Sequence, residues 1–132
     1  MNQLLLPDIR VKGGPLAASE VRSHLERELA DELEQERLGE LRLLATEVVS
    51  NSVRHGGVDG DGWVTAGVAL DAEKVRVEIR DSSIEGEPVP RSPDYEGDGG
   101  GFGLLLLDQI ASAWGVERDR GLCVWFELAV AD

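Results

Sequence analysis

Apolar residues recur at every fourth position in the first periodic segment of the chain, which predicts an amphipathic helix over residues 16–33. The apolar stripe of this helix consists of Val21, Leu25, Leu29 and Leu33. A short loop over residues 32–36 leads to a second predicted helix, over residues 38–55, which ends at two glycines. The buried side of the second helix carries Leu41, Leu44, Ala45, Val48 and Val49.

Strands are predicted before and after these helices in the sequence. The apolar start of the chain, interrupted by Pro7, is typical of an edge strand. Residues 62–70 and 75–81 predict two strands joined by a turn over residues 71–74, which makes an antiparallel hairpin. Apolar and charged residues alternate along the second of these strands, so one of its faces is expected to be in contact with solvent.

Residues 82–101 are rich in glycine and proline and carry few apolar side chains, which predicts a long loop. Loops of this length are uncommon in compact domains and are often lids or binding loops. A third helix is predicted over residues 102–114, and closing strands over residues 115–117 and 122–130.

Composition restricts the possible functions. The 132 residues, 42% of them apolar, predict a single domain over residues 1–132. Lys and Arg number 13 against 26 Asp and Glu, and the net charge of -13 disfavours direct binding to nucleic acid or to anionic lipid. A bound phosphate would therefore need local amides and a metal. A single cysteine and the absence of a long apolar run or a signal sequence predict a cytoplasmic protein without membrane spans.

The second predicted helix carries a polar row made of Glu47, Asn51, Arg54 and His55. A carboxylate and a carboxamide one turn apart can hold a hard cation such as Mg²⁺, and the carboxylate can orient or deprotonate an attacking oxygen. The same spacing also occurs on solvated helix faces, and His55 could serve only as a cap of the helix C-terminus.

Asp81 lies where the second strand of the predicted hairpin ends and the long loop begins. A carboxylate in this position can accept a hydrogen bond from an exocyclic amine such as that of adenine, which would select the base. The alternative is an Asx turn that leads into Ser82 and Ser83.

Residues 97–104, with the sequence Gly-Asp-Gly-Gly-Gly-Phe-Gly-Leu, lead directly into the third predicted helix. Unencumbered backbone amides and a helix N-terminus meet there, which favours binding of an anion. The segment is not a Walker loop, because no Lys-Ser or Lys-Thr follows the glycines. A flexible hinge before a helix is the alternative.

In their order along the chain, these segments resemble the histidine kinase-like (GHKL) ATPase superfamily, and within it the stand-alone anti-sigma-factor serine/threonine kinases. Residues 47–56 resemble the N box of the family, and residues 81–83 its Asp-x-Gly adenine motif. Residues 101–104, Gly-Phe-Gly-Leu, resemble the second glycine box, and residues 123–128 resemble the last strand of the sheet.

The resemblance implies an α+β fold, a two-layer α/β sandwich of the GHKL (Bergerat) ATP-binding type. Its sheet is mixed but mainly antiparallel, and three helices cover one face. The resemblance also implies that Asn51 ligates Mg²⁺ and that Glu47 is the general base or orients the acceptor. The residues implied in binding ATP are Asn51, His55, Asp81, Ser83, Gly99, Gly101, Phe102, Gly103 and Leu104.

The function implied is phosphorylation of a serine or threonine on an anti-sigma-factor antagonist, together with sequestration of a sigma factor and a possible homodimer. The alternative is a catalytically weak or inactive ATP-binding module that acts only by protein binding. Ser83 stands in place of a glycine of the adenine motif, and the long loop is acidic, with Arg91 as its one cation. Any of Trp63, Trp114 and Trp125 found exposed would indicate a docking face.

Overall fold

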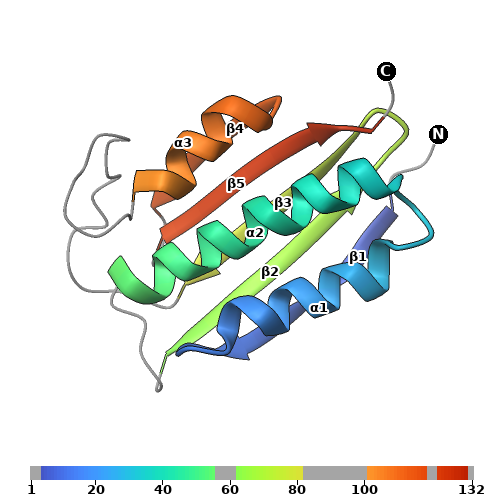
Figure 1. The fold of residues 1–132 in the computed structure, drawn as a ribbon. Coiled ribbons are helices and arrows are strands. Elements are labelled where there is room, and N and C mark those ends of the chain that lie inside the picture. The colour runs from blue at the N-terminus through green and yellow to red at the C-terminus, as the bar shows by residue number, and fades with distance from the viewer. Residues whose placement is uncertain (1–3, 56–61, 82–100, 119–121, 131–132) are drawn as a thin grey trace.

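A computed structural model describes residues 4–55, 62–81, 101–118 and 122–130 of the chain. These residues form two layers, a five-stranded sheet and three helices that lie on one of its faces (Figure 1). The strands are β1 (Leu4–Lys12), β2 (Trp63–Leu70), β3 (Lys74–Asp81), β4 (Ala113–Arg118) and β5 (Leu122–Ala129). The helices are α1 (Ala17–Leu29), α2 (Gln35–His55) and α3 (Gly101–Ile110). The predicted two-layer α+β sandwich is confirmed.

The sheet has the strand order β1-β2-β3-β5-β4. Every pairing between the described strands is antiparallel, so the sheet is more regular than the mixed arrangement that was expected. β1 is an edge strand, as predicted, and its register with β2 shifts between Leu6 and Ile9. Pro7 falls inside this shift, where the missing N–H of a proline costs little because the ladder is already interrupted.

The predicted hairpin is formed by β2 and β3. The Asp71 carboxylate accepts the backbone N–H groups of Glu73 at 2.8 Å and of Lys74 at 2.9 Å. The Asp71 N–H donates to the Lys74 carbonyl at 3.0 Å and closes the turn. These backbone hydrogen bonds favour the ionised carboxylate and lower the pKa of Asp71.

Two predicted helix ends are wrong. α1 ends at Leu29 rather than at residue 33, and the Leu29 carbonyl accepts the amides of both Glu32 and Leu33 in the turn that follows. α3 ends at Ile110 rather than at residue 114, and Trp114 belongs to β4. There the amide and the hydroxyl of Ser112 both donate to the Glu127 carbonyl of β5, so the chain has already joined the sheet.

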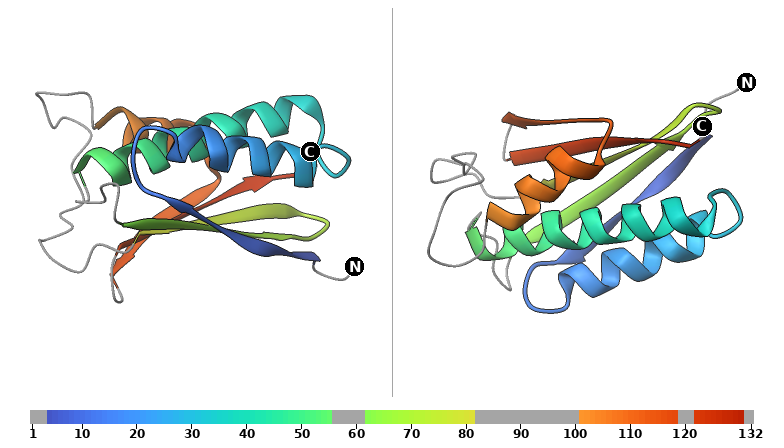
Figure 2. Two further views of the ribbon diagram at one scale, coloured as in Figure 1. Left: turned by 90° about the horizontal axis from the view of Figure 1, so that it is seen from below. Right: turned by 45° about the horizontal axis from the view of Figure 1, so that its top comes forward.

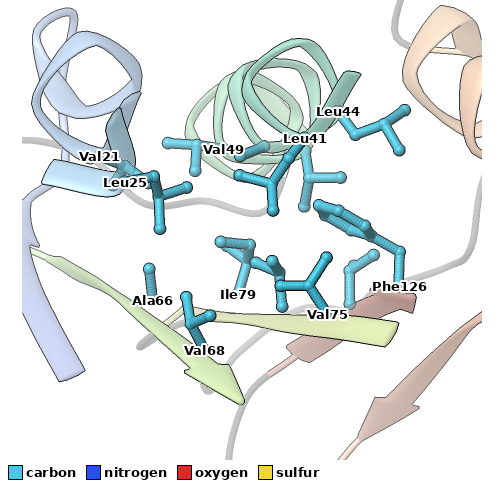
Figure 3. Packing of buried hydrophobic residues seen from close by; sticks show 14 of the residues in the cluster. Val21, Leu25, Leu41, Leu44, Val49, Ala66, Val68, Val75, Ile79 and Phe126 are labelled. Atoms are coloured by element: carbon cyan, nitrogen blue, oxygen red, sulfur yellow. The ribbon is translucent and has the colours of Figure 1, made fainter. Parts of the chain in front are cut away.

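The core fills the space between the helices and the inner face of the sheet. Figure 3 shows Val21 and Leu25 of α1 and Leu41 and Val49 of α2 above the side chains of β2, β3 and β5. Figure 2 shows the same two layers from the side, with the opposite face of the sheet not covered by any described element. Burial of this apolar layer is the main force that holds the helices against the sheet.

Candidate functional site

Three of the predicted site segments meet at one end of the molecule. The C-terminal end of α2, the end of β3 and the start of α3 lie at the same end of the two layers (Figure 1). α2 packs against β3, β5 and α3, so these elements are true neighbours. The fold therefore gathers segments that are far apart in the sequence.

Asn51 is half-buried in the last two turns of α2. It follows Leu44 by seven residues and so lies close to the same side of the helix. Figure 3 shows Leu44 on the side of α2 that faces α3 and β5. The Asn51 side of the helix is therefore directed toward the start of α3.

Glu47 is also half-buried, and it lines a shallow pocket with Gly14 and Pro15 of the β1–α1 turn and with Ala18 of α1. Ser50 and Val53 of α2 complete this pocket. The contribution of the β1–α1 turn was not predicted. Its signal was present as Gly13-Gly14-Pro15, but the sequence alone indicated only a turn and not which helix it faces.

Asp81 ends β3 on the side of the sheet that faces the helices, in register with Val64 of β2. Only 6% of the residue is exposed, and among the described residues Ser52 of α2, at 5%, is the other buried polar side chain. Burying a carboxylate in an apolar layer is costly unless it meets a donor. A buried acceptor at this point suits the recognition of an amine, which is the chemistry expected of an adenine site.

The glycine-rich segment leads into a helix, as predicted. Gly101, Phe102, Gly103 and Leu104 form the first turn of α3, where backbone N–H groups are free of intrahelical acceptors. The side chains of Phe102 and Leu104 lie outside the described residues, as does that of His55, although its backbone ends α2. Ser83, Gly99 and most of the predicted long loop also lie outside the described residues.

The described residues contain neither a metal-binding cluster of His, Cys, Asp or Glu nor a helix suited to cross a membrane. Within those ranges, no three His, Cys, Asp or Glu side chains gather into a cluster that could hold a metal ion. Mg²⁺ ligation by Asn51 thus stays a prediction. None of the described helices combines the length and the apolar character needed to cross a membrane.

Comparison with known proteins identifies the fold and the family. Residues 14–128 match the family described as the histidine kinase-like ATPase domain. The structure of the RsbU and RsbW domains of Rv1364c from Mycobacterium tuberculosis is similar, with a TM-score of 0.63 and 20% identity. The histidine kinase domain of a blue-light-activated histidine kinase from Erythrobacter litoralis is also similar, with a TM-score of 0.58 and 19% identity. The catalytic domain of the histidine kinase ThkA is similar with a TM-score of 0.52 and 17% identity.

The matched structures differ in how much of each protein is shared. The alignment with the Rv1364c structure covers 94% of this chain and 32% of that structure. The alignment with the Erythrobacter litoralis domain covers 86% of this chain and 59% of that structure, and the alignment with ThkA covers 95% and 97%. The chain therefore spans about a third of the Rv1364c structure. At these identities the structures establish the fold, whereas the family match, over most of the chain, supports an ATP-binding role. No curated protein sequence matches the chain.

Proposed function

We propose that this chain, which belongs to the histidine kinase-like ATPase domain family, binds ATP with Mg²⁺ at the end where α2, β3 and α3 meet and transfers phosphate to a protein. The observation that carries the proposal is the buried carboxylate of Asp81 on the helix side of β3. It lies at the same end of the layers as the Asn51 end of α2 and the start of α3.

Each site residue has a chemically distinct role in this proposal. Asp81 accepts a hydrogen bond from the exocyclic amine of adenine and so selects ATP over nucleotides that lack that donor. The amides of the first turn of α3, around Gly101 and Gly103, bind phosphate oxygens. Asn51 contributes an oxygen ligand for Mg²⁺, which when bound neutralises phosphate charge. His55, Phe102, Leu104, Ser83 and Gly99 complete the proposed nucleotide site.

Glu47 orients or deprotonates the acceptor hydroxyl. Its pocket, shared with Gly14 and Pro15, opens on the α1 side of α2. Glu47 lies one turn before Asn51 on the same polar row, so an acceptor that enters this pocket comes close to the nucleotide on the flank toward α3. One rigid helix thus holds the donor and the acceptor within reach of each other.

The acceptor that we propose is a serine or threonine of an anti-sigma-factor antagonist in the cytoplasm, and the chain would also sequester a sigma factor as a homodimer. The similarity to a structure that contains an RsbW domain supports this choice. The alternative function is an ATP-binding module that acts by protein binding alone. Ser83 favours it, because a side chain occupies the place of a glycine that should lie close to the base.

Calorimetric titration with ATP and Mg²⁺ tests the site. Asp81→Asn should weaken ATP binding by about tenfold or more and reduce the preference for ATP over GTP, because the amide adds a donor where the amine needs an acceptor. Glu78→Gln, on the outer face of the same strand, is the matched control and should leave affinity unchanged. Equal ATP affinities for wild type and Asp81→Asn would show that Asp81 does not recognise adenine.

Transfer of labelled phosphate from ATP to a co-purified antagonist tests the kinase function. Glu47→Gln should abolish labelling and retain ATP binding, whereas Glu40→Gln, on the same helix and paired with Arg37 at 3.0 Å, should retain both. A wild-type chain that binds ATP but labels no partner establishes the binding module instead.

A further inference from the structure

The open edge of the sheet borders a groove that meets the Glu47 pocket only at Pro15. Among the described strands, β1 pairs only with β2, so its other edge is unpaired. The groove runs between that edge and α1 and has a volume of about 780 Å³. Residues 9–13 form one wall, and Leu16, Ser19, Ser23 and Arg27 line the other. Its volume lies within the range of established binding pockets.

The alternation of hydrogen-bonded pairs between β1 and β2 shows which backbone groups of β1 point into this groove. The Gly13 N–H donates to the Gly62 carbonyl at 2.9 Å, which continues the register of Lys12 opposite Trp63. Hydrogen-bonded and non-hydrogen-bonded pairs alternate in an antiparallel ladder. Val11 is therefore bonded to β2, while the N–H and C=O groups of Arg10 and Lys12 are directed away from it. The backbone groups of these two residues can therefore form hydrogen bonds with a further strand.

The same two residues place positive charge along the edge. The Arg10 guanidinium lies 5.3 Å and the Lys12 ammonium 5.9 Å from the ring centre of Trp63, on the outer face of the sheet. Trp63 is itself 38% exposed, the outcome that was expected to mark a docking face. Arg27 adds a cation on the α1 side, and among the described residues Glu20 is the one acidic residue that lines the groove. This edge is thus cationic in a chain of net charge -13.

On the helix side of the groove Leu16 supplies an apolar contact beside the polar residues Ser19, Glu20, Ser23 and Arg27. Val11 faces inward from β1 and is buried. Leu16, at the start of α1, is 66% exposed although it is a large apolar residue, and it lines the groove. An extended segment in the groove would cover Leu16 with every second side chain.

We propose that the β1–α1 groove binds an extended acidic segment of a partner protein, which adds to the sheet as an antiparallel strand beside β1. Acidic side chains of the segment lie across from Arg10 and Lys12, and the apolar side chains between them contact Leu16. Backbone hydrogen bonds supply affinity, and the charge pairs fix register and partner choice. This interaction goes beyond the proposed kinase and needs no nucleotide.

A second copy of the chain is a poorer occupant of the groove. Two β1 edges paired antiparallel about Val11 would bring Arg10 of one copy opposite Lys12 of the other, and like charges directly opposite each other destabilise a strand pair. The observed charge therefore favours an acidic partner over self-association.

The first test uses a capped heptapeptide of alternating Glu and Val, with binding to the full chain followed by fluorescence anisotropy and by amide shifts in the absence of ATP. We expect saturable binding, together with slower hydrogen exchange of the Arg10 and Lys12 amides. N-methylation of the Glu amides should abolish binding, because these groups face β1, whereas N-methylation of the Val amides should spare it. A purely ionic association would not distinguish the two methylated peptides, and that result would overturn the proposal.

Variants of the protein supply the second test. The double variant Arg10→Glu with Lys12→Glu should weaken peptide binding by about tenfold or more. Lys74→Glu, a charge reversal at the far end of β3, should change the affinity for the peptide less than about twofold. Unchanged far-ultraviolet circular dichroism of both variants shows that they fold. Equal weakening by both variants overturns the proposal, and so does a dimer of the wild type that protects the Arg10 and Lys12 amides in the absence of peptide. Because ATP is absent, neither failure bears on the nucleotide site.

Discussion

Strand β3 presents Val75, Val77 and Ile79 to the helices and Arg76, Glu78 and Arg80 to the opposite face of the sheet. The inner side chains are at most 1% exposed and pack in a continuous apolar core. The outer side chains are bonded mainly to each other and to β5. The same eight residues thus serve two environments with different energetics.

The outer face is held by charge and stacking. The Arg76 guanidinium donates to Glu78 at 2.9 Å and to Glu127 at 3.1 Å, and it lies 4.2 Å from the ring centre of Trp125. Burial alone would raise the pKa of Glu78, but the hydrogen bonds from Arg76 and Arg80 outweigh it and lower the pKa. Partly exposed ion pairs contribute little each, so the inner face fixes the fold and the outer face can vary with function.

Phe126→Ala should have the largest effect, because its ring is fully buried on the inner face. We expect a loss of about 3–5 kcal/mol in the free energy of unfolding, measured by urea denaturation. Lys74→Ala on the outer face should stay within about 0.5 kcal/mol. Comparable losses for the two variants would show that the faces do not differ as described.

Gly115→Ala probes close packing on the outer face. A Cβ there would lie 2.8 Å from the indole of Trp125, so the ring must move and its stacking with Arg76 is disturbed. The expected cost is about 1–3 kcal/mol, with a change in tryptophan fluorescence. Gly39→Ala in α2 is the control: nothing lies within 4 Å of its Cβ, and the variant should gain about 0.5–1 kcal/mol.

Arg76→Ala should cost about 1 kcal/mol, since it removes a stacking contact and two ion pairs on a side chain that is 29% exposed. The difference from wild type should shrink as salt screens the pairs. Arg76→Lys retains the charge but not the planar stack and should recover only part of the loss. Full recovery in the lysine variant would assign the effect to charge alone.

The smallest effect concerns pH. A lowered pKa means that ionised Glu78 stabilises the folded chain above its unfolded pKa of about 4.3, and that this contribution is lost as the pH falls through the lower folded pKa. Glu78→Gln should therefore be less stable than wild type near neutral pH, and the two should converge in acid. Urea denaturation across that range checks the prediction, and a difference that grows in acid contradicts it.

The predicted site was recovered unevenly. The sequence placed Glu47 and Asn51 on one helix and Asp81 at a strand end, and the structure has them there. It could not show that Glu47 meets Gly14 and Pro15, since those residues are distant in the chain and no local period links them. The roles of these side chains toward ATP stay predictions.

By itself, the sequence determined the elements and their two faces, because helix and strand periods record which side chains must leave water. The tertiary structure decided where elements stop and what lies beside them. α3 ends early because the Ser112 amide and hydroxyl bind the Glu127 carbonyl. Arg10 and Lys12 border a groove because space remains between α1 and the open edge of β1. Such contacts join distant segments, so only folding brings their groups within bonding distance.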